Sequence, residues 1–496
     1  MHGVNFAREI VDASAPERLA LVELARDGSR REWSFARVAG ASAALAGALR
    51  RHGVGRGEVV MTLIGNRPEW VLSMVACMRI GAVVLPCTEQ LRAKDLRLRI
   101  ETAQPALVVS DERNARELQA ALASLAEPPQ VLYVPDEALL SGEPAAAVEL
   151  DADEPCLITF TSGTAGEPKA VVHAQRYLLG QRAQAEHWLA ARAGELVWCT
   201  AASGWSKSAR NVFIAPWLTG AAALLHDARF DPHERLALLA RERVNVLCMA
   251  PTEYRVIAKR AQLSPLPALR GMVAAGEALN PEVLRAWHEA TGLEIRDGYG
   301  QTETGQLTGA PLHEPARSGS MGRALPGVRL AVQDGELTVE PTSVPTFFLG
   351  YLGEHVRRER DGGWSVRDRR EGERWHTGDR VREDDGWLYF EGRTDDVIVS
   401  AGYRIGPFEV ESALVAHPAV AEAAAVAAPD EERGAVVRAV VVLRGEHTPS
   451  PELARELQEH VKRETAPYKY PRIVDFAEEL PKTASGKVKR AQLRAR

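Results

Sequence analysis

Along the first half of the chain, apolar and polar positions alternate in a way that predicts strands joined by helices. Residues 33–51 put apolar side chains on one face of a helix, and Ser34 is placed to cap its first turn. A second helix is predicted over 66–78. Short apolar runs predict strands at 58–64, 82–86 and 106–110. The alternation continues to about residue 275 and is typical of an α/β fold with largely parallel sheets covered by helices.

The pattern changes after about Gly322. Short β-like pieces separated by glycine- and aspartate-rich turns predict a β-rich subdomain, with strands near 328–332, 335–339 and 386–390. After Arg393 the order becomes hairpin, helix, two strands and helix, which is typical of a small α+β domain. We therefore expect an α/β protein with a large N-terminal domain, 1–394, of two α/β sheet subdomains plus a β-rich subdomain. A small α+β C-terminal domain, 395–496, should follow it.

The composition is that of a globular protein with more than one core. A chain of 496 residues is too long for a single ordinary core, and its hydrophobic and charged fractions, 45% and 26%, suit a soluble globular protein. The net charge of -6 excludes a general basic surface for nucleic acid. The basic run from Lys482 to Arg496 predicts either a solvated tail or part of a site.

No segment resembles a membrane span or a signal peptide. The most apolar stretch, 70–87, is interrupted by Arg79 and Gly81, so it predicts a buried helix that runs into a strand. The N-terminus carries early charges and lacks an apolar core, and we therefore expect a cytoplasmic protein. The cysteines form no Cys-x-x-Cys pair. We expect buried free thiols, without a metal-binding or catalytic role, at Cys77, Cys87, Cys156, Cys199 and Cys248.

The strongest local signal for chemistry is the run from Thr161 to Lys169, TSGTAGEPK, which follows an apolar strand at 156–160. Hydroxyl groups and glycines in a turn present O–H and backbone N–H donors to anionic oxygens, and a nearby lysine adds positive charge. A bound triphosphate needs these groups. The run is not a Walker A loop, because it lacks the Gly-Lys-Ser/Thr order. The alternative is an ordinary surface loop.

Four further motifs follow in order along the chain, and each is a weak signal when taken alone. They are 299–304 (YGQTET), 376–379 (HTGD), 392–396 (GRTDD) and 481–487 (PKTASGK). Together with the phosphate loop, and over nearly the whole chain, they resemble the adenylate-forming superfamily of acyl-CoA synthetases, luciferases and peptide-synthetase adenylation domains. Three more stretches resemble its medium-chain acyl-CoA synthetase branch: 203–208 (SGWSKS), 400–407 (SAGYRIGP) and 466–472 (APYKYPR).

The resemblance implies a site for each part of ATP. The β- and γ-phosphates would be held by Thr161, Ser162, Gly163, Thr164 and Lys169. The adenine would be framed by Gly276, Glu277 and Tyr299. Two further residues would have catalytic roles. Thr302 would contact the α-phosphate, and Glu303 would help to hold Mg²⁺, a hard cation that suits a carboxylate with phosphates. Asp379, with Arg393 beside it, would accept hydrogen bonds from the ribose. The catalytic Lys487 would bridge the carboxylate of the acid and the α-phosphate.

Sites for the acid and for CoA are implied in the same way. An acyl pocket would be lined by Gly204, Trp205 and Ala275, with Phe213 and Trp217 as further apolar walls. CoA would be contacted by Gly402, Arg433, Lys462 and Tyr470. A hinge at Asp395 would let a mobile C-terminal domain rotate between steps. Two positions depart from the family pattern, since Ala165 removes a hydroxyl group from the phosphate loop and Ala401 removes a possible CoA contact.

We therefore expect an AMP-forming acid–thiol ligase. It would activate a medium-chain fatty or aryl acid with ATP and Mg²⁺, and then transfer the acyl group to CoA, releasing AMP and pyrophosphate. One alternative is a stand-alone ligase that loads a carrier protein. An amino-acid-activating domain is a second, but it usually has an aspartate near Gly204 and Trp205, and this chain has none there. A non-catalytic binding module is a third, and the presence of Lys487, Glu303 and Asp379 argues against it. The identity of the acid and the oligomeric state are left open.

Overall fold

The computed structural model describes residues 3–161, 168–276, 281–359, 362–370, 372–394, 396–400, 403–430, 433–445, 447–483 and 487–494. The chain forms two compact units. The first contains Met1–Thr161, Lys169–Arg329 and Glu340–Glu373, and the second contains Ser162–Pro168, Leu330–Val339 and Arg374–Arg496. The expected boundary between residues 394 and 395 is a prediction about which part rotates, and it stays a prediction.

One large sheet of the first unit has the strand order β20-β8-β7-β4-β3-β5-β6. Its strands are β3 (Val59–Leu63), β4 (Val83–Cys87), β5 (Leu107–Asp111), β6 (Gln130–Val134), β7 (Pro155–Phe160), β8 (Ala170–Ala174) and β20 (Gly350–Tyr351). The strands from β7 to β6 in this order pair in parallel, whereas β8 runs antiparallel to both β7 and β20. The expected phosphate loop is therefore the connection between two adjacent strands, β7 and β8.

The second large sheet has the order β13-β12-β11-β9-β10-β1-β2. Its strands are β1 (Leu19–Leu24), β2 (Arg30–Ser34), β9 (Leu196–Cys199), β10 (Ala222–His226), β11 (Val246–Met249), β12 (Gly271–Ala275) and β13 (Ile295–Gly298). All neighbours are parallel except β1 and β2. The carboxyl ends of parallel strands meet at one edge, which is where ligands bind in α/β sheets. The two sheets confirm the predicted fold class.

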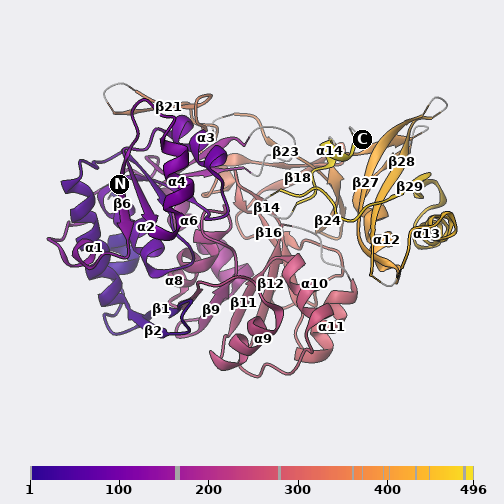
Figure 1. The fold of residues 1–496 in the computed structure, drawn as a ribbon, viewed down its shortest axis with the longest axis horizontal. Helices are drawn as coiled ribbons and strands as arrows, with labels where there is room; N and C mark the ends of the chain where they lie inside the picture. Colours follow the sequence, from indigo (N-terminus) through magenta and orange to yellow (C-terminus); the bar gives the residue numbers. More distant parts are fainter. Residues whose placement is uncertain are drawn as a thin grey trace. The chain divides into compact units, whose positions relative to one another are not determined.

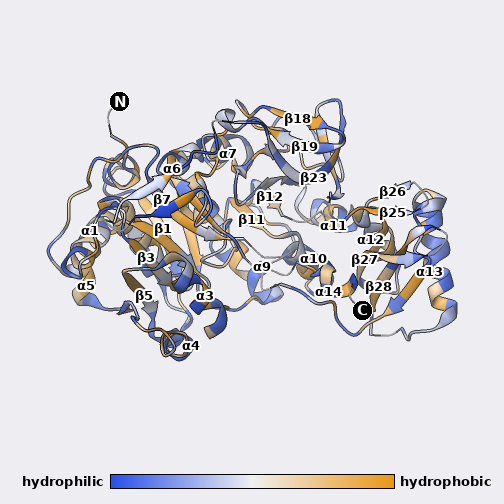
Figure 2. Ribbon diagram, turned by 90° about the horizontal axis from the view of Figure 1, so that it is seen from above, coloured by the Kyte–Doolittle hydropathy of each residue, from blue (hydrophilic) through white to orange (hydrophobic). Residues whose placement is uncertain are grey.

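Helices cover these sheets (Figure 1), and Figure 2 shows strands that are largely in the hydrophobic colour. They are α1 (Phe35–Arg51), α2 (Pro68–Ile80), α3 (Ala93–Ala103), α4 (Ala115–Leu122), α5 (Glu137–Ser141), α6 (Arg176–Gly180), α7 (Arg182–Gln184), α8 (Ala215–Thr219), α9 (Pro232–Arg241), α10 (Pro251–Arg260) and α11 (Pro281–Thr291). A short π-helical segment, η4 (Arg210–Ile214), precedes α8. Small hairpins complete the unit, with strands β14 (Gly300–Gln301), β15 (Gly305–Gln306), β16 (Thr308–Gly309), β17 (Arg323–Ala324), β21 (Val356–Arg358) and β22 (Trp364–Val366).

Two predicted helices begin later than expected. Helix α1 begins at Phe35, and Ser34 caps it by accepting a hydrogen bond from the backbone N–H of Arg37 at 3.3 Å. Trp33, which was expected inside this helix, lies in strand β2, where its indole N–H donates to Glu23 at 3.1 Å. The helix expected from residue 66 begins at Pro68, a residue suited to the first helical turn.

The predicted buried helix is confirmed. Every residue of α2 is buried, and Gly81 ends the helix with a φ of 75°, a left-handed conformation that glycine adopts without strain. Strand β4 follows, fully buried. All five cysteines are free and buried, as predicted. Within the described ranges, no helix combines the length and the apolar character needed to cross a membrane.

The second unit contains both the predicted β-rich segment, which was expected in the large N-terminal domain, and the predicted small α+β domain. An antiparallel sheet of order β18-β19-β23-β24 contains β18 (Leu330–Gln333), β19 (Glu336–Val339), β23 (Trp375–Asp384) and β24 (Trp387–Arg393). The rest comprises β25 (Ile398–Ser400), β26 (Tyr403–Ile405), α12 (Pro407–Ala416), β27 (Val420–Asp430), β28 (Gly434–Leu443), α13 (Pro451–Glu464), β29 (Ile473–Phe476) and α14 (Arg490–Arg494). Figure 1 shows α12 and α13 beside the β27-β28-β29 sheet.

Candidate active site

The two ends of the expected phosphate loop are tied together by hydrogen bonds. The backbone N–H of Thr161 donates to the Lys169 carbonyl at 2.9 Å, and the Lys169 N–H donates to Thr161 Oγ1 at 3.0 Å. These bonds extend the pairing of β7 with β8 by one residue. Thr161 and Lys169 therefore face each other where the loop begins and ends. The other expected phosphate ligands, Ser162, Gly163 and Thr164, lie outside the described residues, as does Ala165.

A tyrosine joins the expected metal-binding acid to the expected phosphate-binding lysine. The Tyr351 hydroxyl donates to Glu303 Oε1 at 2.8 Å, and Lys169 Nζ lies 4.6 Å from the centroid of the Tyr351 ring. Lys169 also forms an ion pair with Glu354 at 3.0 Å. Burial and the nearby Glu303 carboxylate raise the pKa of Tyr351 well above its usual range, so its hydroxyl keeps the proton and remains a donor.

The Tyr299–Thr304 motif is a tight turn that presents two side chains. Strands β14 and β15 pair antiparallel, and the turn lies between them. A Cβ on Gly300 would lie 1.9 Å from the Gly305 carbonyl oxygen, so only glycine fits there. The turn is fixed from below by the Thr346 hydroxyl, which donates to the Thr304 carbonyl at 2.6 Å. The half-buried side chains presented by the turn are Thr302 and Glu303.

The expected adenine site contains a lysine that the motifs did not mark. Lys207 Nζ donates to the Ala275 carbonyl at 3.0 Å, and a Cβ on Gly276 would lie 2.7 Å from the same nitrogen. Gly276 has a φ of 103°, so its replacement would also strain the backbone. Tyr299 starts the next segment, with its N–H donating to Thr308 Oγ1 at 3.0 Å. Glu277, the remaining expected adenine residue, lies outside the described residues.

An aspartate near the end of β13 has an unusually high pKa. Burial raises the pKa of Asp297 to about 8, against the opposing effects of the Gly298 backbone N–H, 2.8 Å away, and of the Lys207 charge. Asp297 is therefore largely protonated at neutral pH and does not neutralise Lys207.

The expected acyl-pocket residues differ in exposure. Gly204 has a φ of 86°, and a Cβ there would lie 2.2 Å from the Thr88 nitrogen, so the Gly204–Trp205 turn requires glycine. Trp205 is half-buried, whereas Ala275 is 7% exposed at the end of β12. The further apolar walls, Phe213 and Trp217, pack in the core of the unit with ring centroids 5.0 Å apart.

In the second unit, the expected ribose-binding acid and its arginine are partners across a strand pair. Asp379 on β23 lies opposite Arg393 on β24, and Arg393 Nη1 donates to Asp379 Oδ1 at 3.1 Å. Asp379 is buried, and its backbone N–H donates to Thr377 Oγ1 at 3.1 Å. The structure therefore brings these two predicted residues together.

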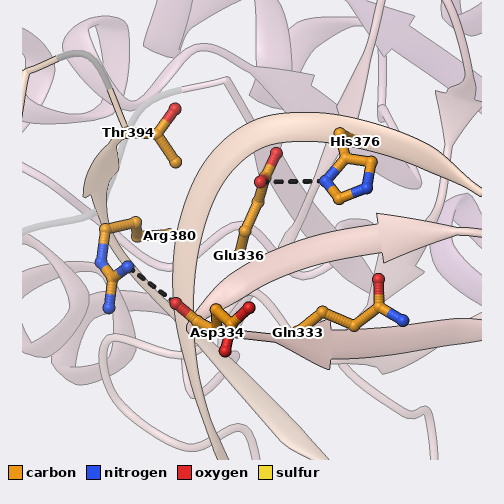
Figure 3. Close-up of a pocket in the computed structure, with 6 residues that line it drawn as sticks. All are labelled: Gln333, Asp334, Glu336, His376, Arg380 and Thr394. Atoms are coloured by element: carbon orange, nitrogen blue, oxygen red, sulfur yellow. Dashed lines mark hydrogen bonds and ion pairs between the residues drawn. The ribbon is translucent and has the colours of Figure 1, made fainter.

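A glutamate on β19 makes contacts that hold strand β23 in place. Glu336 accepts a hydrogen bond from the Gly378 N–H at 2.8 Å through Oε1, and its Oε2 lies 3.0 Å from His376 Nδ1. Figure 3 shows this contact at a surface pocket of about 470 Å³, lined by Gln333, Asp334, Glu336, His376, Arg380 and Thr394. Thr394 also donates to the Gly378 carbonyl, from its N–H at 2.8 Å and from its hydroxyl at 3.0 Å.

Lys487 lies at an exposed position of the C-terminal segment. Its N–H donates to Thr483 Oγ1 at 3.2 Å, and its carbonyl accepts from the Thr483 N–H at 2.8 Å. The basic run around it is anchored to acids and is not simply a solvated tail. The Lys482 ammonium lies 2.6 Å from Glu422, and Arg490 binds Glu411 at 2.8 Å. This anchoring fixes the segment that carries Lys487.

Two of the expected CoA residues meet in the structure. Lys462 Nζ, on α13, lies 4.3 Å from the centroid of the Tyr470 ring, which also has the Arg472 guanidinium 5.0 Å from its centroid. Arg433 is half-buried beside the β27–β28 turn, and its N–H donates to Asp430 at 2.9 Å. Gly402 and the neighbouring Ala401 lie outside the described residues, as does the expected hinge residue Asp395.

The sequence patterns did not identify the residues that contact and orient the predicted site residues. They are Lys207, Asp297, Glu336 and Tyr351. Lys207 stands inside the quoted SGWSKS stretch, and Asp297 stands two residues before Tyr299, so both had a local signal. Tyr351 and Glu336 lie far along the chain from their partners, 48 residues from Glu303 and 42 from Gly378, and no local pattern marks them.

Comparison with known proteins gives full-length relatives. A family model described as AMP-binding enzyme matches residues 9–352, and one described as AMP-binding enzyme C-terminal domain matches residues 409–487. The chain is 38% identical over 510 residues to a Bacillus subtilis (strain 168) protein named uncharacterized acyl-CoA ligase YtcI, covering 98% of this chain and 94% of that protein. It is 36% identical to mitochondrial acyl-coenzyme A synthetase ACSM3 of Mus musculus, covering 99% and 90%. A solved structure of the anthranilate CoA ligase AuaEII in complex with anthranoyl-AMP superposes with a TM-score of 0.87 at 27% identity, covering 100% and 97%.

Proposed function

The chain belongs to the AMP-binding enzyme family, and we propose that it joins a carboxylic acid to coenzyme A through an acyl-adenylate, at the residues described above. Family membership, with acyl-CoA synthetases as full-length relatives, makes the chain an AMP-forming acid–thiol ligase, as the sequence predicts. In the first step the acid attacks the α-phosphate of ATP and pyrophosphate leaves. In the second step the CoA thiol attacks the acyl carbonyl and AMP leaves.

The observation that carries the proposal is the Glu303–Tyr351–Lys169 arrangement. It places a carboxylate and an ammonium group on the two sides of one tyrosine, next to the two ends of the phosphate loop. A nucleotide triphosphate with its metal ion presents negative oxygens and a hard cation side by side, and it needs this combination of groups. Lys169 would bind phosphate oxygens in place of its contact with Glu354.

The donor set fits Mg²⁺. A magnesium ion in a nucleotide site takes one or two carboxylates and completes its shell with phosphate and water oxygens. Glu303 supplies such a carboxylate, and the Tyr351 hydroxyl fixes its orientation through Oε1. When bound, the ion neutralises phosphate charge as pyrophosphate departs. Thr302 and Lys487 would then stabilise the charge that develops at the α-phosphate, while Asp379 and Arg393 would hold the ribose.

Replacing Tyr351 by phenylalanine tests the carboxylate orientation. Without the hydroxyl, Glu303 loses the donor at Oε1 and is less well placed for the cation. Hydrogen bonds to charged groups contribute about 1.5–3 kcal/mol, so we expect Tyr351→Phe to raise the KM for Mg-ATP about tenfold or more. Steady-state kinetics over a magnesium titration measures this effect. Tyr133→Phe on β6, which also removes a hydroxyl group, should leave the KM unchanged.

For the second step we propose free CoA as the acceptor. Lys462 and Tyr470 combine a cation with an aromatic face, which suits a nucleotide that carries both phosphate and adenine. Arg433 and Arg472 add guanidinium groups that can bind phosphate oxygens. An exposed stacked pair, Tyr403 and Tyr468, lies in the same unit with ring centroids 4.4 Å apart. This set of groups favours a nucleotide-bearing acceptor over the carrier-protein alternative.

Reversing the charge at Lys462 tests the acceptor site. Lys462→Glu places a carboxylate near the expected CoA phosphates, and we expect the KM for CoA to rise about tenfold or more while adenylate formation stays unchanged. Arg463→Glu makes the same change of charge one residue further along α13, at an exposed position, and it should have little effect. Equal changes in both variants would point to a general electrostatic effect and away from a contact at Lys462.

The function as a whole is tested by a panel of carboxylic acids. Pyrophosphate release is measured with ATP, Mg²⁺ and each acid, with and without CoA. Medium-chain fatty acids and aryl acids are the two classes expected from the sequence. Thioester formation with free CoA supports the proposal. Transfer only to a phosphopantetheinylated carrier protein would identify a carrier-loading ligase, and turnover of amino acids alone would identify an amino-acid-activating enzyme.

A further inference from the structure

A buried arginine follows the expected acyl-pocket residue Trp205 along the chain and has no acidic partner among the described residues. Arg210 is the first residue of η4 and is 3% exposed. Among the described residues, its Nε and Nη1 have no hydrogen-bond partner, and no acidic side chain lies within ion-pair distance of the guanidinium. A buried charge without a partner is strongly unfavourable, and buried charges in proteins are normally paired.

Two other buried arginines of this chain have such partners, whereas Arg99, 9% exposed, donates to the Asp95 backbone carbonyl and lies over the Phe160 ring. Arg79, 4% exposed, binds Asp12 at 2.8 Å and 2.5 Å. Arg235, 6% exposed, lies 3.4 Å from Glu253. In both cases the buried guanidinium group is paired with a carboxylate, as buried charges in proteins usually are. Arg210 therefore differs in its surroundings and not in its depth.

The groups around Arg210 are polar but carry no negative charge. The Tyr177 hydroxyl has Arg210 and Gln181 as neighbours, and the His173 ring lies 4.1 Å from the Tyr177 ring. Burial, together with the charges of Arg210 and Arg176, lowers the pKa of His173 to about 3, so this histidine is neutral at physiological pH. Its Nδ1 and the Oε1 of Gln181 also have no partner among the described residues. The described residues of the cluster thus include no anion, and the Nε and Nη1 of Arg210 are donors that an anion could use.

The position of Arg210 relates it to the tail of the acid. The burial of the side chains increases along the chain. Trp205 and Lys207 are half-buried, and Arg210, about one helical turn beyond Lys207, is buried. The charge of Arg210 acts on Cys248 at the end of β11 and on His173 of β8, whose ring faces the backbone of Thr302. Arg210 is therefore more deeply buried than Trp205. The reacting carboxylate must stay at the nucleotide, so the tail is the part of the acid that can reach Arg210.

We propose that Arg210 binds a second carboxylate at the far end of the acid, so that the preferred substrate is a dicarboxylic acid. The inference rests on the proposed acyl-adenylate function and names its substrate class. A carboxylate accepts two parallel hydrogen bonds from a guanidinium group, a geometry that uses the unpaired Nε together with one Nη. The ammonium of Lys207, whose charge Asp297 does not neutralise, adds to the positive potential at the entrance. The same two cations disfavour an amino group at the far end of the acid.

The wild-type enzyme is tested first, with matched pairs of acids that differ only in the second carboxylate, such as hexanoate with adipate and benzoate with terephthalate. We expect kcat/KM for pyrophosphate release to favour the better dicarboxylate by at least about tenfold over its matched partner. Thermal unfolding gives a readout that does not depend on turnover, since the same dicarboxylate should raise the Tm of the protein and its monocarboxylate partner should not.

Arg210→Met then tests the residue itself. The variant should lose the preference for dicarboxylates and the associated Tm increase, while turnover of monocarboxylates is kept or increased. Its Tm without ligand should be no lower than that of the wild type, because an unpaired buried charge is replaced by an apolar side chain. Arg235→Met is the matched control. It should leave the acid preference unchanged and lower the Tm, because Glu253 then loses its partner. Arg210→Lys should keep part of the preference.

The outcomes separate this inference from the proposed function. Efficient use of monocarboxylates with no response to dicarboxylates, or an unchanged preference in Arg210→Met, overturns the role of Arg210 and leaves the acyl-CoA ligase function intact. Failure of every acid to release pyrophosphate with ATP overturns the proposed function, and the inference with it. A dicarboxylate preference that disappears in Arg210→Met and persists in Arg235→Met supports both.

Discussion

Replacing Lys487 by alanine is expected to lower the rate of adenylate formation by several orders of magnitude while leaving the second half-reaction largely intact. In the first step, negative charge accumulates around the α-phosphate as the carboxylate attacks, and a positioned ammonium stabilises that transition state more than the ground state. In the second step the CoA thiol attacks a carbonyl carbon, and the same ammonium is not required. The side chain stands on an anchored segment, where Thr483 and Lys487 exchange two hydrogen bonds.

Separate assays of the half-reactions measure this prediction. Pyrophosphate release reports the first step, and thioester formation from supplied acyl-AMP and CoA reports the second. Lys489→Ala is the matched control, because Lys489 lies two residues away on the same segment and also carries an ammonium group. It should retain both activities. Equal losses of both half-reactions in Lys487→Ala would contradict a role confined to adenylate formation.

Much of the fold could be predicted because its strands and buried helices carry long apolar runs. Helix α2 and strand β4 follow each other in one apolar stretch, and only Arg79 and Gly81 interrupt it. The hairpin of β1 and β2 was missed for the opposite reason. Strand β2 lies at the edge of its sheet and begins with exposed Arg30, Arg31 and Glu32, so its pattern is that of a polar approach to the next helix.

The site divides in the same way. The proximity of Asp379 and Arg393, which stand in contiguous motifs, could be predicted from the sequence, and the structure pairs them at 3.1 Å. Their role at the ribose stays a prediction. The residues that orient the predicted side chains could not be predicted, because contacts such as that of Tyr351 with Glu303 join distant parts of the chain. Arg210 could not be identified either. An arginine among apolar residues is usually at a surface, and only the structure shows that this one is buried without an acidic partner among the described residues.

The segment proposed as a hinge has anchors on both sides. On one side, Thr394 donates two hydrogen bonds to the Gly378 carbonyl, at 2.8 Å and 3.0 Å, which ties it to the strand that carries Asp379. On the other side, the Asp396 carboxylate pairs with Arg490, at 3.5 Å, and with Arg494, both on helix α14. The backbone N–H of Asp396 also donates to the Arg393 carbonyl on β24 at 3.1 Å, so a rotation here would have to break this hydrogen bond. We place the proposed rotation at Asp395, between these anchors. This is the position that the family resemblance suggests.

Asp395→Pro is therefore expected to have the reverse effect of Lys487→Ala. Proline fixes φ near one value and removes the backbone N–H, so a hinge that must adopt two backbone conformations is confined to one of them. If the accessible conformation is the one that presents Lys487 to ATP, pyrophosphate exchange survives and thioester formation falls roughly a hundredfold or more. Asp395→Ala removes the same carboxylate without restricting φ, and it should keep both half-reactions. An equal loss of thioester formation in the two variants would attribute the effect to the carboxylate, and loss of both half-reactions in Asp395→Pro would contradict a rotation about this residue.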